Sequence, residues 1–247
     1  MLVRNPQNFL KDRVVQNSRW LLGTGLLTAE GDAWKRQRRL IQPAFSRDRI
    51  ADYARCMTDS AEQMLASWKA GTVVDIHQEM MSLTLRVVVR ALFGLETMET
   101  GKISRSLNTI MLNSIGGRLL LPPFFRYLPL SGMRDVRRAV GDMNVAVYEI
   151  VRQRRSGNKQ ASGDLLSLLM NARDEDGSRM SDEQLRDELM TFLLAGHETT
   201  ALALSWALSL LSHSAEAEEN LHEELDRVLT LSGHANPANE GHLKTGQ

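Results

Sequence analysis

LMTFLLAGHETTALALSWALSLL, at residues 189–211, is the longest apolar stretch of the chain, and four adjacent polar residues, 197–200, interrupt it near its middle. One of these four residues is an acid, Glu198. An ionised carboxylate that is removed from water is costly unless it is paired or performs a task. We therefore expect Glu198 to be buried, and we look for function at this position.

The length of the stretch is compatible with a membrane span, which takes about 20 apolar residues. An acid at its centre costs roughly 2.5 to 3.5 kcal/mol on insertion scales, however, and the other helical segments have one polar face. The sequence therefore favours a helix that is buried on all sides in a soluble protein. Ser181 and Gln184 form a capping box ahead of the stretch, so we expect one long helix over about residues 182–212.

The polar interruption does not match a zinc-protease motif. That motif needs a second histidine one turn after the first, and Ala201 occupies the position. Gly196 costs about 1 kcal/mol in a helix interior, which makes sense where a group must approach the backbone closely. The hydroxyl of Thr199 can donate to a bound species, or it can bond back to the carbonyl of Ala195 and bend the helix.

The composition is typical of a cytoplasmic globular protein. The chain has 247 residues, 43% of them hydrophobic, which can supply a sizeable core. Its 30 basic residues balance 30 acidic ones, which argues against a nucleic-acid partner. A lone cysteine, Cys56, excludes an internal disulfide and is typical of a reducing compartment. Residues 1–6 lack the apolar stretch of a secretory signal.

Apolar residues recur at spacings of three and four over most of the chain, which predicts amphipathic helices. We find no convincing strand, no internal repeat and no linker, so we expect a single, mainly α domain over residues 1–247. The final segment, residues 230–247, is polar and has no period. The predicted helices besides the long one cover residues 49–69, 76–94, 136–151, 163–173 and 215–229.

A basic cluster, Trp-Lys-Arg-Gln-Arg-Arg at residues 34–39, is a second candidate for chemistry. Trp34 and Arg38 are four residues apart and share a helix face, so an indole N–H and a guanidinium can meet one anionic group. Arginine suits this role because its planar fork binds a carboxylate through two hydrogen bonds. The alternative is a solvated basic face with one buried tryptophan.

Several motifs occur in a fixed order along the chain. They are Gly-Thr-Gly-Leu-Leu-Thr (23–28), Glu-Gly-Asp (30–32), Trp-x-x-x-Arg (34–38), Pro-Ala-Phe (43–45), Asp-Leu-Leu (164–166) and Ala-Gly-His-Glu-Thr-Thr (195–200). In this order they resemble the cytochrome P450 family, the haem-thiolate monooxygenases. The resemblance covers nearly the whole chain and implies the mainly α fold of that family.

By this resemblance the cofactor would be a b-type haem. Trp34 and Arg38 would contact a haem propionate. Ala195 and Gly196 would lie against the oxygen side of the haem. The resemblance further implies O2, an apolar small-molecule substrate, and electrons from an NAD(P)H-dependent partner such as a ferredoxin, a flavodoxin or a reductase. It implies neither nucleic acid nor a transmembrane segment.

The resemblance also implies roles around the substrate. Glu198 and Thr199 would form the acid and alcohol pair that supplies protons during oxygen activation. Water-excluding pockets need such a positioned relay, which agrees with the reading from the residues alone. Leu26 and Leu27 would wall the substrate pocket above the haem, and residues 122–130 would line substrate entry.

The family's cysteine loop, Phe-x-x-Gly-x-Arg-x-Cys-x-Gly, does not occur in this sequence. Cys56 lies in Ala-Arg-Cys-Met without a glycine nearby, and we interpret it as a small, partly buried hydrophobic residue. We therefore expect an incomplete chain, without the amino-terminal strands and the carboxy-terminal half, that is inactive alone. The alternative is a non-catalytic helical binding or scaffold remnant that has lost the haem ligand. No metal-ligating residue is predicted.

Overall fold

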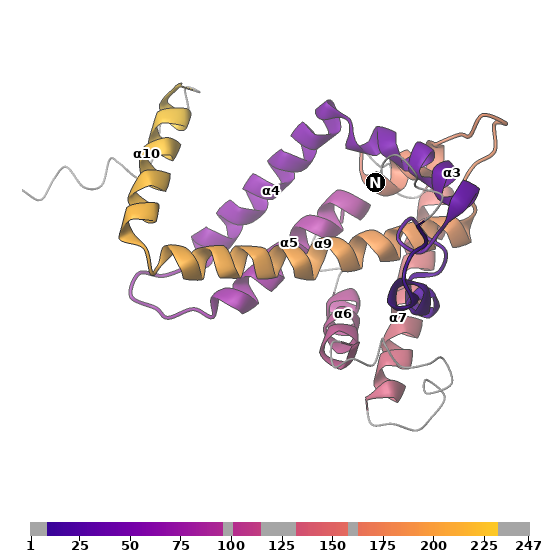
Figure 1. Ribbon diagram of the computed structural model, residues 1–247, viewed down its shortest axis with the longest axis horizontal. Helices are drawn as coiled ribbons and strands as arrows, with labels where there is room; N and C mark the ends of the chain where they lie inside the picture. The colour runs from indigo at the N-terminus through magenta and orange to yellow at the C-terminus, as the bar shows by residue number, and fades with distance from the viewer. Residues whose placement is uncertain (1–8, 96–100, 115–131, 158–162, 232–247) are drawn as a thin grey trace, which may run out of the picture. The chain divides into compact units, whose positions relative to one another are not determined.

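The computed structural model describes residues 9–95, 101–114, 132–157 and 163–231 (Figure 1). The chain forms two compact units, residues 1–201 and residues 202–247, and each is described by itself. Within the described ranges every regular element is helical and no strand occurs, so the prediction of a mainly α fold is confirmed. Residues 122–130 lie outside the described ranges, as does most of the polar segment after residue 230.

The first unit contains α1 to α8 and most of α9. The second contains the end of α9 together with α10. The helices are α1 (Arg13–Asn17), α2 (Arg19–Leu22), α3 (Gly31–Ile41), the 3₁₀ turn η2 (Gln42–Phe45), α4 (Arg47–Ser67), α5 (Ile76–Phe93), α6 (Gly101–Ser114), α7 (Met133–Arg155), α8 (Leu165–Asn171), α9 (Asp182–Leu211) and α10 (Ala215–Leu231).

Capping side chains set where several of these helices begin. The capping box before α9 is present: the Ser181 N–H donates to Gln184 Oε1, and the Gln184 N–H donates to Ser181 Oγ, both at 3.1 Å. Asp75 accepts the N–H of Gln78 at the start of α5. Gly94 ends the same helix in the left-handed conformation that favours glycine, at φ 61°. These local signals explain why the sequence locates the ends of α5 and α9 well. Helix α7 has no side-chain cap at its start and covers Met133–Arg155, where the sequence predicted 136–151.

The core of the first unit lies around the first half of α9. Leu189, Met190 and Leu193 of α9 are fully buried, as the apolar stretch predicts. They belong to one cluster with the apolar faces of α5 and α7, where Phe93 and Met143 are also fully buried. The apolar stripe of α7, which recurs at spacings of three and four, therefore faces this core as predicted, with Val136, Val140, Met143, Val147 and Val151 all buried. Helix α5 contributes Leu85, Val89, Leu92 and Phe93 to the cluster, whereas Met80 belongs to a second, smaller cluster.

The burial of helix α9 decreases toward its carboxy-terminal end. Ten of its residues are buried, and the last of them is Ala201. Beyond that point, within the second unit, Trp206 and Leu210 each expose 67% of their surface. The expectation of a helix buried on all sides is therefore wrong for its carboxy-terminal third. Burial depends on which neighbours surround a helix, and a run of apolar residues does not specify them.

A search of the described helices finds none long and apolar enough to cross a membrane.

A buried ion pair joins three helices of the first unit. Arg154 of α7 donates to Asp164 Oδ2 at 2.7 Å, and the side chains expose only 9% and 4% of their surface. The other arm of Arg154 donates to the carbonyl of Phe93 at the end of α5. Asp164 in turn caps α8 by accepting the N–H of Ser167 at 2.8 Å. Both charged groups at this junction thus replace lost water by hydrogen bonds.

Candidate functional site

The Ala-Gly-His-Glu-Thr-Thr motif occupies two turns in the second half of α9. Ala195 and Thr199 are exposed, while Gly196 and Glu198 are half-buried. The expectation that Glu198 is a buried acid is therefore wrong, because it lies on a flank of the helix that solvent reaches. Residues four apart share one side of a helix, so Ala195 and Thr199 form a single exposed row.

His197 is the buried polar residue of the motif, with 3% of its surface exposed. Its Nε2 lies 3.0 Å from the carbonyl oxygen of Met81, which ties α9 to α5. Burial lowers the pKa of His197 and so favours the neutral ring. A Cβ added at Gly196 would lie 3.1 Å from Val88 Cγ2 of α5. This side of the motif serves packing, and the close neighbour of Gly196 within the described residues is Val88.

The hydroxyl of Thr199 donates to the carbonyl oxygen of Ala195 at 2.6 Å. The sequence allowed Thr199 either to donate to a bound species or to bond back to the carbonyl of Ala195. The structure contains the bond to Ala195. A hydroxyl whose proton is used in this way keeps its lone pairs, so it can accept a hydrogen bond from a species on the exposed side of the helix. The hydrogen bond thus leaves the acceptor capacity of the Thr199 hydroxyl unused by Ala195.

The loop of residues 23–28 packs directly on α9. A Cβ added at Gly25 would lie 2.6 Å from Thr191 Oγ1 and 2.7 Å from the carbonyl oxygen of Asp187, so a larger residue cannot be placed there. At Gly23, which has a φ of 64°, a Cβ would overlap the carboxylate of Asp187. The two glycines therefore allow the backbone of the loop to touch the helix.

Two acids of α9 hold this loop, and the sequence analysis did not identify them. Asp187 accepts the N–H of Thr24 at 2.7 Å, and Glu188 accepts the N–H of Leu26 at 2.8 Å. A signal was available: Arg186, Asp187 and Glu188 are consecutive charged residues between leucines. Three consecutive residues point to three sides of a helix, so in a surrounded helix they are all buried, and each then needs a partner.

Glu188, and not Glu198, is the fully buried acid of α9. Its side chain is fully buried, and Oε1 has no hydrogen-bond partner among the described residues. Burial raises the pKa of Glu188 to about 7, against the opposing effect of the hydrogen bond from Leu26. The neighbouring charge of Asp187 raises the pKa further, and Lys11 lowers it.

The predicted anion-binding residues lie on α3. The guanidinium of Arg38 lies 5.3 Å from the centre of the Trp34 ring, as their spacing predicts. Arg36 and Arg39 both bind Asp174, at 2.7 and 2.8 Å. Within the described ranges, Arg38 forms no ion pair and is exposed. Among the residues that the structure describes, Arg38 is thus the arginine of the basic cluster without an ion pair.

Helix α3 is also connected to the loop. Gln37 Nε2 donates to the carbonyl oxygen of Thr24 at 2.7 Å, while the N–H of Thr24 is bound by Asp187. The structure therefore links α3, the loop and α9 through consecutive hydrogen bonds. Leu26 is half-buried, and Leu27 exposes 44% of its surface from the same loop.

These residues fit one side of a haem. The exposed row of Ala195 and Thr199 has small side chains that a flat ring can approach, and the positive charge of Arg38, which has no ion-pair partner in the described part of the chain, suits a carboxylate. The axial ligand is not supplied by the same region. Cys56, the only cysteine of the chain, is half-buried on α4 and lies outside this arrangement.

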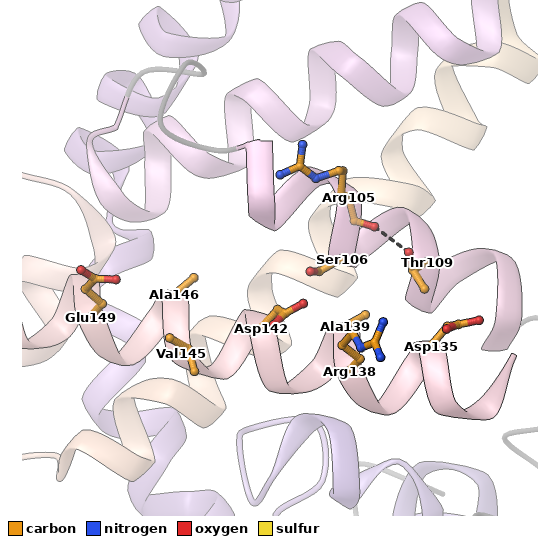
Figure 2. A pocket seen from close by; sticks show the side chains of 10 residues that line it. All are labelled: Arg105, Ser106, Thr109, Asp135, Arg138, Ala139, Asp142, Val145, Ala146 and Glu149. Atoms are coloured by element: carbon orange, nitrogen blue, oxygen red, sulfur yellow. Dashed lines mark hydrogen bonds between the residues drawn. The ribbon is translucent and has the colours of Figure 1, made fainter. Parts of the chain in front are cut away.

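A cavity of about 500 Å³ lies elsewhere, between α6 and α7 (Figure 2). Its walls carry charges of both signs, among them Arg105, Arg138 and Asp142. Figure 2 shows that these side chains come from α6 and α7 alone. No residue of the candidate site lines this cavity, so size alone does not make it the site of chemistry.

Comparison with known proteins explains the arrangement on α9. A family model described as "Cytochrome P450" matches residues 2–240. The chain belongs to the cytochrome P450 family. A crystal structure of the "cytochrome P450DA heme domain" has the same fold, with a TM-score of 0.74 and 30% sequence identity. The match covers 94% of this chain and 52% of that one.

The curated relatives of this cytochrome P450 chain include a synthase and an oxygenase by name. It is 36% identical to cyclooctatin synthase of Streptomyces melanosporofaciens over 219 residues, which are 87% of this chain and 48% of that enzyme. It is 34% identical to pentalenene oxygenase of Streptomyces avermitilis over 214 residues, 86% of this chain and 47% of that enzyme. The chain thus spans about half the length of these relatives.

Proposed function

We propose that this chain provides the oxygen side of the haem site, and the loop above it, in a monooxygenase that inserts one oxygen atom from O2 into an apolar small molecule. The proposal rests on the contact between the loop of residues 23–28 and α9. Gly25 touches Thr191, and Thr191, Ala195 and Thr199 are each four residues apart on one row of the helix. Leu26 and Leu27 follow Gly25 directly, so in this proposal they lie near the start of that row.

In this proposal the cofactor is a b-type haem, which supplies the redox chemistry when it is bound. Arg38, with Trp34, would hold a propionate, because its charge has no ion-pair partner among the described residues. Ala195 and Gly196 would present a flat surface to the ring. Electrons would come from NAD(P)H through a ferredoxin, a flavodoxin or a reductase in the cytoplasm.

Two residues of α9 would take part in proton transfer. Thr199, which donates its own proton to the carbonyl of Ala195, would accept a hydrogen bond from a water or a hydroxyl beside the substrate. Glu198 is half-buried, so its carboxylate can exchange protons with solvent on one side and reach the site on the other. Leu26 and Leu27 would exclude bulk water from the substrate, which keeps protons on this route.

The proposal is tested in a completed enzyme, made by joining residues 1–247 to the segments of cyclooctatin synthase that lie outside its match to this chain. With haem, NAD(P)H and a redox partner, the completed enzyme should incorporate one atom of isotopically labelled O2 into an apolar probe such as pentalenene or cyclooctat-9-en-7-ol. A completed enzyme that carries a full complement of haem but oxidises no apolar probe would favour the non-catalytic remnant.

The 247-residue chain by itself should not form a thiolate-ligated haem. Thiolate ligation pushes electron density onto the iron and shifts the Soret band of the reduced carbonyl complex to the red. The only thiol is on Cys56, outside the candidate site, so the purified chain mixed with haem should lack this band. The matched variant, Cys56→Ser, should have the same spectrum. A red-shifted band that disappears in Cys56→Ser would contradict our interpretation of this cysteine.

A further inference from the structure

The backbone of Leu26 is held on both sides by charged side chains. Its N–H donates to Glu188 Oε2 at 2.8 Å, and its carbonyl oxygen accepts a hydrogen bond from Lys11 Nζ at 2.8 Å. Lys11 is fixed in turn, because its backbone N–H donates to Glu30 Oε1 at 2.7 Å. A loop residue that is bound through both backbone groups has little freedom to turn, so its side chain is aimed by these contacts.

We propose that Glu188 is a positioning residue, which holds Leu26 and the adjacent Leu27 in place against α9, and that protonation of Glu188 stabilises this closed loop against opening to water. The orientation of these leucines toward a substrate rests on the proposed function. Their positioning by Glu188 does not depend on that function. The acid touches neither the substrate nor the cofactor in this proposal. It acts through the loop.

The surroundings of Glu188 explain why it would respond to protons. The carboxylate is fully buried and accepts one hydrogen bond, while Oε1 has no partner among the described residues. The charged groups that face it are Asp187 on its own helix and Lys11 on the amino-terminal segment. Asp187 is itself bound by Arg186 Nη1 at 2.8 Å. The charge of Lys11 also interacts with that of Glu30.

The direction of the effect follows from linkage. The pKa of Glu188 is raised from 4.5 to about 7 in the closed loop, so the closed state binds the proton more tightly than a state in which water reaches the acid. The closed loop is therefore most stable at low pH and becomes less stable as the pH rises through about 7. Opening that hydrates the carboxylate should become roughly 40-fold more favourable between about pH 5 and about pH 7.

Hydrogen exchange of the 247-residue chain, resolved by peptide, tests the proposal without haem or substrate. After correction for the intrinsic rate, exchange in residues 24–27 should accelerate over this pH interval, by up to the roughly 40-fold given by linkage. Glu188→Gln keeps an acceptor for Leu26 but cannot ionise, so its corrected rates should not change with pH. Glu183→Gln, at an exposed position in the first turn of α9, removes the same charge and should behave as the parent.

A second variant separates positioning from general stability. Glu188→Leu removes the acceptor, so residues 24–27 should exchange faster than in the parent at every pH, while residues 189–194 of α9 remain protected. Equal acceleration in both segments, or a pH dependence that persists in Glu188→Gln, would overturn the proposal. Because no oxidation is measured, these results stand or fall independently of the monooxygenase activity.

Discussion

Replacing Thr199 by alanine in the completed enzyme should divert electrons from the oxygenated product to hydrogen peroxide. The hydroxyl is fixed by its hydrogen bond to the carbonyl of Ala195, so its lone pairs have one direction in which to accept a proton-bearing group. Removing a positioned participant in proton transfer costs about 10²- to 10⁴-fold in the step that it serves. Consumption of O2 and NAD(P)H should continue, because neither depends on this hydroxyl. The measurement is product and peroxide formed per electron consumed.

Two matched variants make this result specific. Thr199→Ser keeps a hydroxyl that can bond to Ala195 and should retain coupling, whereas Thr200→Ala alters an exposed neighbour on a different side of the helix and should resemble the parent. Glu198→Gln should instead slow turnover and increase the solvent deuterium isotope effect, because it removes the acid that we propose as the source of protons. Unchanged coupling in Thr199→Ala, at a haem content equal to the parent's, would remove this residue from the mechanism.

Replacing Arg154 by leucine should lower the free energy of unfolding by about 3 to 5 kcal/mol, because it leaves the buried carboxylate of Asp164 without its counter-charge. The same change also removes the hydrogen bond to the carbonyl of Phe93, so α5, α7 and α8 lose their common junction. Urea unfolding of the 247-residue chain, followed by circular dichroism, measures the loss.

The next residue on α7 provides the control. Arg155 forms an ion pair of 2.6 Å with Asp182, but the two side chains expose 36% and 51% of their surface. Exposed pairs contribute about 0 to 1 kcal/mol, since water already solvates both charges. Arg155→Leu should therefore have a small effect. Equal losses in Arg154→Leu and Arg155→Leu would show that burial does not set the strength of the Arg154–Asp164 interaction.

The sequence of a single helix does not determine which of its acids is buried. The position of Glu198 in the longest apolar run predicts burial, yet Glu198 is half-buried and Glu188 is fully buried. Hydrophobicity along a helix reports how much apolar surface it has. Which turn is enclosed depends on the loop and helices that pack against it, and those come from distant parts of the sequence.

The same reason applies to Arg38. The sequence places three arginines on one short helix and cannot rank them. In the folded chain Asp174, more than a hundred residues away, binds Arg36 and Arg39 and leaves Arg38 without an ion pair among the described residues. Its availability to an anion is thus a result of tertiary pairing.

The sequence by itself determined the mainly α fold, most of the longer helices and the family, but it missed α6 and both ends of α7. Capping residues such as Ser181 and Gln184 act within one turn, and apolar periodicity acts within one element, so both are readable without the fold. Only the tertiary structure decided that the loop of residues 23–28 lies on α9, that Glu188 holds it, and that Glu198 is only half-buried. These features depend on contacts between segments far apart in the chain, whose geometry no local pattern encodes.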